Sequence, residues 1–144
     1  MNRKYVDDIR AFNRFYTNML GLLNTHILGS RFSLAEVRIL YELYHQKNFT
    51  AKDIIDTLHM DKGQLSRMLL NFENQKLIVR ARSKTDKRSM LLSLTKKGVT
   101  EFETLNKASQ NQILQLLTQL EEKNLTELIH HMKGITQILS GIKK

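Results

Sequence analysis

Apolar residues recur every three or four positions along most of this chain, which is the spacing of one face of an α-helix. The first such stretch predicts a helix over about residues 3–28, with Gly29 as its C-cap. One face of this helix carries Ile9, Phe12, Tyr16, Met19 and Leu23, and a second carries Phe15, Leu20 and Leu22. Two apolar faces predict a helix that is covered on both sides.

Later helix starts are marked by a side chain that can accept a hydrogen bond from an unpaired backbone N–H, with an acid or amide three residues on. The pairs are Ser33 with Glu36, Thr50 with Asp53, Asp61 with Gln64, and Asn124 with Glu127, and Thr95 is expected to cap a further helix. With the apolar spacing, they predict helices over about residues 34–46, 51–58, 62–76, 96–121 and 125–143.

The helices predicted over 51–58 and 62–76 are joined by His59-Met60-Asp61 alone, so they must cross steeply, as in a helix-turn-helix. After Leu77 the pattern becomes that of two strands, over 78–82 and 89–94, with a polar loop between them. The predicted fold class is therefore mainly α with a small β-hairpin wing: a winged helix-turn-helix domain plus a helical dimerisation region.

The last predicted helix has apolar residues spaced alternately by three and four, which is the seam of a coiled coil. The seam residues are Leu125, Leu128, Met132, Ile135, Leu139 and Ile142. We expect this seam, together with Ile9 of the first helix, to form a homodimer. The predicted division is residues 1–29 and 99–144 for dimerisation and residues 30–98 for the winged helix-turn-helix DNA-binding domain.

Positive charge is concentrated in one segment. The formal net charge is +9, and ten Lys/Arg against three Asp/Glu place a net +7 within residues 61–100, whereas residues 101–144 are neutral. A basic surface confined to one segment predicts a polyanionic partner, and we expect double-stranded DNA.

The helix predicted over 62–76 is expected to read the DNA. Its polar side opposes Leu65, Met68, Leu69 and Phe72, and Leu70 falls on the polar side without an assigned role. Gln64 and Asn71 suit adenine, Arg67 suits guanine or a phosphate, and Gly63 allows close approach of the backbone. The predicted contact residues are Lys62, Gly63, Gln64, Ser66, Arg67 and Asn71. The alternative is an ordinary solvated face.

The hairpin loop carries Lys84, Lys87 and Arg88 with the single acid Asp86. A charged arm of this kind can enter a narrow minor groove, where a guanidinium is favoured. We expect Asp86 to orient Arg88 rather than touch DNA. The alternative is a loop made polar for solubility.

Aromatic residues gather in and near the first two predicted helices. They can line a pocket for a small aromatic ligand, with Phe12, Tyr16, Arg38 and Tyr41 as the expected lining and Arg14 or Arg38 pairing a carboxylate. The alternative at this helical spacing is plain core.

Several classes of protein are not supported. With no cysteine, disulfides, thiolate zinc sites and thiol redox sensing are excluded. The five histidines lack metal-site spacing and no catalytic motif occurs, so we expect no metal, no cofactor and no enzyme. No apolar run approaches the roughly 20 residues of a membrane span, so no membrane contact and a cytoplasmic location are expected.

Over nearly its whole length the chain resembles the MarR (multiple antibiotic resistance regulator) family of transcription factors. The resemblance lies in residues 61–67 and 72–78, then in the D-x-R-S run from Asp86 and the L-x-L-T-x-x-G run ending at Gly98. The family's wing arginine corresponds to Arg88 and its aspartate to Asp86. The resemblance implies a homodimeric repressor that binds a palindromic operator and is released by a small, often aromatic, ligand.

We therefore expect a sequence-specific transcriptional regulator that binds double-stranded DNA. The alternative is a winged-helix protein-interaction module without sequence-specific DNA binding, which would use the C-terminal seam as its contact. The basic segment favours DNA.

Overall fold

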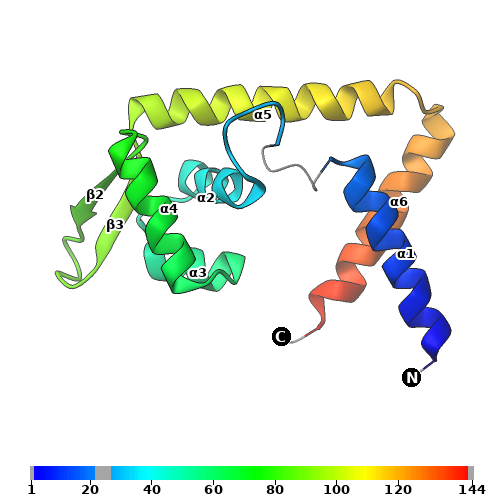
Figure 1. The fold of residues 1–144 in the computed structure, drawn as a ribbon, viewed down its shortest axis with the longest axis horizontal. Coiled ribbons are helices and arrows are strands. Elements are labelled where there is room, and N and C mark those ends of the chain that lie inside the picture. Colours follow the sequence, from blue (N-terminus) through cyan, green and yellow to red (C-terminus); the bar gives the residue numbers. More distant parts are fainter. Residues whose placement is uncertain (1, 22–26, 143–144) are drawn as a thin grey trace. The chain divides into compact units, whose positions relative to one another are not determined.

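The computed structural model describes residues 2–21 and 27–142 (Figure 1). Its elements in chain order are α1 (Arg3–Met19), α2 (Leu34–His45), β1 (Phe49–Thr50), α3 (Ala51–Leu58), α4 (Lys62–Asn74), β2 (Ile78–Arg82), β3 (Met90–Leu94), α5 (Lys96–Leu117) and α6 (Glu122–Ser140). The chain forms two compact units, Met1–Asn106 and Lys107–Lys144. The predicted fold class is confirmed.

Most of the predicted helix caps are formed. Ser33 Oγ accepts the Glu36 N–H at 3.3 Å while the Glu36 carboxylate accepts the Ser33 N–H at 2.8 Å, which completes a capping box. The other caps that are present are Thr50 with Asp53, Asp61 with the N–H of Gln64, and Thr95 with the N–H of Gly98.

Several helix boundaries differ from the prediction. α1 ends at Met19, not near residue 28, because Gly21 follows in a left-handed conformation with φ of 65°. Leu22 and Leu23 lie outside the described residues. α5 ends at Leu117. α6 begins at Glu122 rather than after Asn124, and its N-cap Glu121 makes no side-chain cap bond.

The core of the first unit lies between α2, α3, α4 and a three-stranded antiparallel sheet. The strand order is β1-β3-β2, and Ile78 pairs with Leu94 while Arg82 pairs with Met90. The sequence did not predict β1, which is only two residues long and pairs Phe49 with Leu92. The fully buried side chains include Phe72, Ile39, Leu40, Ile54, Leu65, Leu69 and Leu77.

The end of α4 and the start of α5 are joined through three successive backbone carbonyls. Lys97 Nζ donates to the Gln75 carbonyl at 3.0 Å, and Thr95 Oγ1 donates to the Lys76 carbonyl at 2.7 Å. The Leu77 carbonyl accepts the Thr95 N–H at 2.9 Å. A Cβ built on Gly98 would lie 2.1 Å from the same Leu77 oxygen, so this junction requires glycine.

Candidate nucleic-acid interface

The two faces of α4 are sharply different. Leu65, Leu69 and Phe72 are at most 2% exposed and fix the helix to the core. The turn before it is tight because His59 adopts a left-handed φ of 51° at the end of α3. The predicted contact residues are all exposed on α4, namely Lys62, Gly63, Gln64, Ser66, Arg67 and Asn71.

Gln75 restrains one of these side chains. Its Nε2 donates to Asn71 Oδ1 at 2.9 Å, one helical turn away. Sequence reasoning missed Gln75, although the separation of four residues on a helix is the signal that would have found it. This bond orients the Asn71 side chain towards the C-terminal end of α4.

The wing loop is ordered by its own hydrogen bonds. Ser83 Oγ accepts the N–H groups of Thr85 and Asp86 at 3.3 and 3.2 Å. Asp86 accepts the backbone N–H of Arg88 at 3.0 Å and the hydroxyl of Ser89 at 2.7 Å. These two donors stabilise the carboxylate, the Ser89 hydroxyl first, and hold the pKa of Asp86 below its ordinary value.

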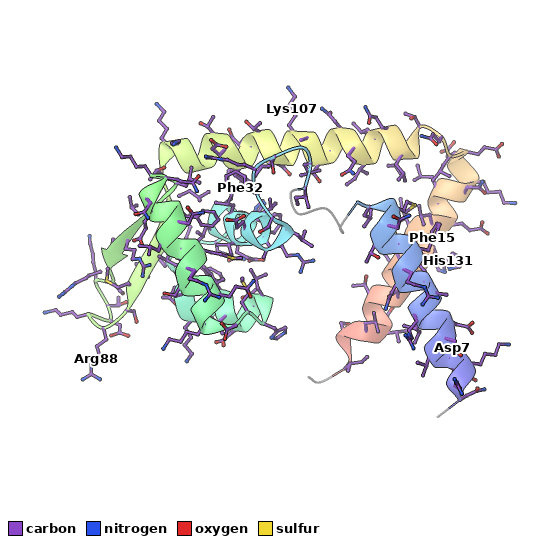
Figure 2. All side chains as sticks on the ribbon, in the orientation of Figure 1. Asp7, Phe15, Phe32, Arg88, Lys107 and His131 are labelled. Atoms are coloured by element: carbon purple, nitrogen blue, oxygen red, sulfur yellow. The ribbon has the colours of Figure 1, made fainter. Side chains whose placement is uncertain are left out.

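Asp86 therefore acts on Arg88 through the backbone. The two salt bridges within the described residues involve other pairs, Arg31–Glu101 and Arg80–Glu73. The Arg88 side chain extends from the tip of the hairpin, away from the ribbon (Figure 2). Lys84 and Lys87 are also exposed on this loop, so the structure presents all three predicted basic groups to solvent.

Glu73 and Arg80 are further residues that the sequence did not single out. Glu73 lies near the end of α4 and Arg80 lies on β2, so their ion pair links the predicted reading helix to the wing. The pairing depends on where the chain turns between helix and strand, which no local pattern encodes.

The predicted effector residues form two separate aromatic groups. Phe12 and Tyr16 stack within α1 with ring centroids 5.5 Å apart. Tyr41 packs against His45 and Phe102, with centroids at 4.3 and 6.1 Å, and Arg38 is exposed on the same helix, α2. No ring contact between described residues joins the two groups.

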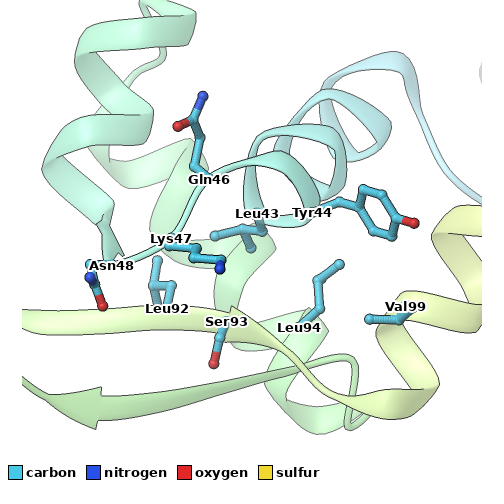
Figure 3. Close-up of a pocket in the computed structure, with 9 residues that line it drawn as sticks. All are labelled: Leu43, Tyr44, Gln46, Lys47, Asn48, Leu92, Ser93, Leu94 and Val99. Carbon is cyan, nitrogen blue, oxygen red and sulfur yellow. The ribbon is translucent and has the colours of Figure 1, made fainter.

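A hollow of about 430 Å³ lies elsewhere, between the end of α2, β3 and the start of α5 (Figure 3). Its lining is Leu43, Tyr44, Gln46, Lys47, Asn48, Leu92, Ser93, Leu94 and Val99. None of the four predicted effector residues lines it, so the effector pocket stays a prediction.

The predicted dimerisation residues are largely uncovered within the single chain. Neither α1 nor α6 contains a buried residue. Exposed fractions are 62% for Ile9, 37% for Leu128, 41% for Met132 and Ile135, 57% for Leu139 and 62% for Ile142, while Leu125 is half-buried.

Membrane-spanning helices and clusters of metal-binding side chains are both absent from the part of the chain that the structure describes. Residues 2–21 and 27–142 contain no helix that is both long enough and apolar enough to span a bilayer. The same residues bring together no group of three or more His, Asp or Glu side chains that could hold a metal ion.

Comparison with known proteins points to one family. The model of the MarR family matches residues 32–89, which run from just before α2 to the end of the wing loop. The HTH-type transcriptional regulator MhqR of Bacillus subtilis is 23% identical over 132 residues, covering 90% of this chain and 91% of MhqR. The organic hydroperoxide resistance transcriptional regulator of Bacillus subtilis is 43% identical over 56 residues, which are 39% of this chain and only 38% of that protein.

Solved structures agree on the fold. FabT of Streptococcus pneumoniae, in complex with DNA, matches with a TM-score of 0.80 at 21% identity over 96% of this chain and 99% of that chain. BpsR of Bordetella bronchiseptica, whose DNA binding is regulated by 6-hydroxynicotinic acid, matches with a TM-score of 0.69 at 15% identity over 90% and 98%. The family model, the near full-length relative and the shared winged-helix fold together support a transcriptional regulator of the MarR family.

Proposed function

We propose that this protein is a sequence-specific repressor that binds a palindromic operator in double-stranded DNA as a homodimer and is released by a small aromatic ligand. The observation that carries the proposal is the pairing of a polar, exposed face on α4 with an ordered basic wing beside it. FabT, which shares the fold, is seen in complex with DNA. The domain division proposed is residues 30–98 for DNA and residues 1–29 and 99–144 for dimerisation.

The two parts of the interface have different tasks. α4 is anchored by buried leucines, so the backbone positions that carry Gln64, Ser66 and Arg67 are fixed, which suits these side chains to reading base edges in the major groove. Lys62 and Gly63 begin the helix, where backbone N–H groups favour a phosphate. Arg88 extends from a loop with Lys84 and Lys87, so its contribution is electrostatic and depends on groove shape.

Dimerisation follows from the uncovered apolar faces. The α6 seam from Leu125 to Ile142 and the α1 face at Ile9 each leave large apolar side chains exposed to water, and such exposed apolar faces mark interaction surfaces. A second copy of the chain covers both in a two-fold arrangement. The DNA-binding domains of the two protomers are then related by two-fold symmetry. They require a DNA site with the same symmetry, which is a palindrome.

The proposed release of the operator requires the binding of a small aromatic molecule. It is supported by the aromatic groups at Phe12/Tyr16 and Tyr41 and the exposed guanidinium of Arg38. The regulation of BpsR by 6-hydroxynicotinic acid supplies a precedent on the same fold. A screen of phenolic and benzoate-like compounds tests it: no change in melting temperature or DNA affinity with any of them contradicts ligand release.

The test of DNA reading begins with selection of bound sequences from a random duplex pool. Wild type, Arg88→Ala and Gln64→Ala are then titrated with salt on the selected operator and on random duplex. We expect Gln64→Ala to cost about 1–3 kcal/mol on the operator and to relax preference at one base pair per half-site. We expect Arg88→Ala to weaken both duplexes and lower the salt slope by about 1 per protomer.

The outcomes separate the two candidate functions. Equal affinity of the wild type for operator and random duplex excludes sequence-specific reading and favours the protein-interaction module. An unchanged affinity and salt slope in Arg88→Ala shows that the wing does not touch DNA.

A further inference from the structure

One leucine of α4, Leu70, lies on the exposed side of the helix and not on the side that packs against the core. Leu70 is 57% exposed, whereas Leu65 and Leu69 on the same helix are 1% and 2% exposed. At 100° per residue Leu70 lies on the outward face, one helical turn from both Arg67 and Asn74, in the middle of the polar stripe. The buried side of α4 is filled without it, so the domain core does not explain an apolar residue here.

The proposed function, on which this inference rests, places that stripe in the major groove. Leu70 would then lose its contact with water and meet the edges of base pairs. Base edges in the major groove offer donors and acceptors at every base pair, and their apolar group is the C5-methyl of thymine. An apolar side chain against a donor or acceptor leaves that group without a partner, which is unfavourable.

We propose that Leu70 is a specificity-determining residue that selects a thymine through its 5-methyl group. Residues three apart on a helix have Cβ atoms about 5–6 Å apart, and successive bases along a strand are about 3.4 Å apart. The selected thymine therefore lies within about two base pairs of the position that Arg67 contacts.

Replacing thymine by deoxyuridine tests this contact, because it removes the methyl group and leaves every hydrogen-bonding group in place. In the operator selected with the full-length wild-type protein, each thymine of one half-site is replaced singly. We expect one replacement, within two base pairs of the position whose preference Arg67→Ala relaxes, to weaken wild-type binding about four-fold, the value of one buried methylene-sized group.

The variants are Leu70→Ala and Leu70→Gln, both compatible with a helix and made at an exposed position. We expect each to bind the thymine and deoxyuridine operators equally and, in a new selection, to lose the thymine preference at that position. Val79→Ala is the matched control, because Val79 is a 50% exposed apolar residue of β2 in the same domain. It should keep the four-fold sensitivity.

Each result has one meaning. Sensitivity in the wild type that disappears in both Leu70 variants supports the contact. Sensitivity that persists in the Leu70 variants, or is absent in a wild type that still prefers its operator, overturns the role of Leu70 and leaves the proposed function intact. A wild type that does not distinguish operator from random duplex overturns the proposed function and this inference with it.

Discussion

The Glu73 carboxylate binds the Arg80 guanidinium at both ends, with Oε1 2.6 Å from Nε and Oε2 3.1 Å from Nη2. This bidentate geometry joins the last turn of α4 to the middle of β2. It is a direct side-chain link between the wing strand and the helix that we propose reads DNA.

The first prediction concerns the strength of this pair. Glu73→Gln and Arg80→Gln should each destabilise the domain, and a double-mutant cycle from denaturant unfolding should give a coupling of about 0.5–1 kcal/mol, since both side chains are about one-third exposed. The Arg31–Glu101 pair, with a single contact at 3.2 Å and a half-exposed arginine, is the control and should couple less. Equal coupling in the two pairs would show that the bidentate geometry contributes nothing.

A second prediction concerns the acid in the wing loop. The pKa of Asp86 is lowered by the Ser89 hydroxyl and the Arg88 N–H, so the carboxylate stabilises the loop above the ordinary pKa of an aspartate. That contribution is lost as the pH falls through the lowered pKa of the folded protein. Ser89→Ala should move the pKa of Asp86 up towards its ordinary value, as followed by NMR titration of the side-chain carboxyl.

An internal control for that titration is Asp53. Its pKa is lowered by the side chain and then the backbone of Thr50 at the start of α3, well apart in sequence from the wing loop. Ser89→Ala should leave it unchanged. A shift of both groups would mean that the substitution disturbs the domain as a whole.

The third prediction tests the junction at Gly98. A methyl group at this position collides with the Leu77 carbonyl oxygen, so Gly98→Ala should destabilise the protein by about 1–3 kcal/mol or more. Gly134→Ala is the matched control, because a Cβ at this helical position meets nothing within 4 Å. It should stabilise α6 by about 0.5–1 kcal/mol. Thermal unfolding of both variants distinguishes a steric effect from a general effect of alanine.

The fourth prediction concerns assembly. Leu128→Glu combined with Leu139→Glu places two charges on the α6 seam and should abolish both the dimer and tight operator binding, as measured by sedimentation and titration. His130→Glu with Gln137→Glu puts the same charges on the opposite side of the helix and should preserve the dimer. A wild type that sediments as a stable monomer at micromolar concentration would refute the dimer itself.

Local signals in the sequence were sufficient for most of the winged domain. The capping pairs at Ser33 and Thr50 and the hairpin after Leu77 were predicted and are present, because each depends on residues within a few positions of one another. β1 was missed because two residues form a strand only when a partner such as Leu92 lies beside them.

The predicted helix boundaries were wrong where several residues were equally able to end or begin a helix. Gly21 and Gly29 both have positive φ, and only the structure shows that α1 has already ended at Met19 before either. In the site, exposure of Gln64 and Arg67 followed from helical periodicity. The Glu73–Arg80 pair did not, because it depends on how a helix end and a strand meet in space.

The three carbonyls shared between the end of α4 and the start of α5 leave this junction little freedom to bend. Lys97, Thr95 and the close approach of Gly98 hold successive peptide groups of the same turn. We expect a tilt of the first turn of α5 to strain these bonds and thereby to act on the last turn of α4. The junction therefore couples the two helices mechanically. We expect a displacement of the beginning of α5 to displace the surface of α4 that carries Arg67 and Leu70 as well.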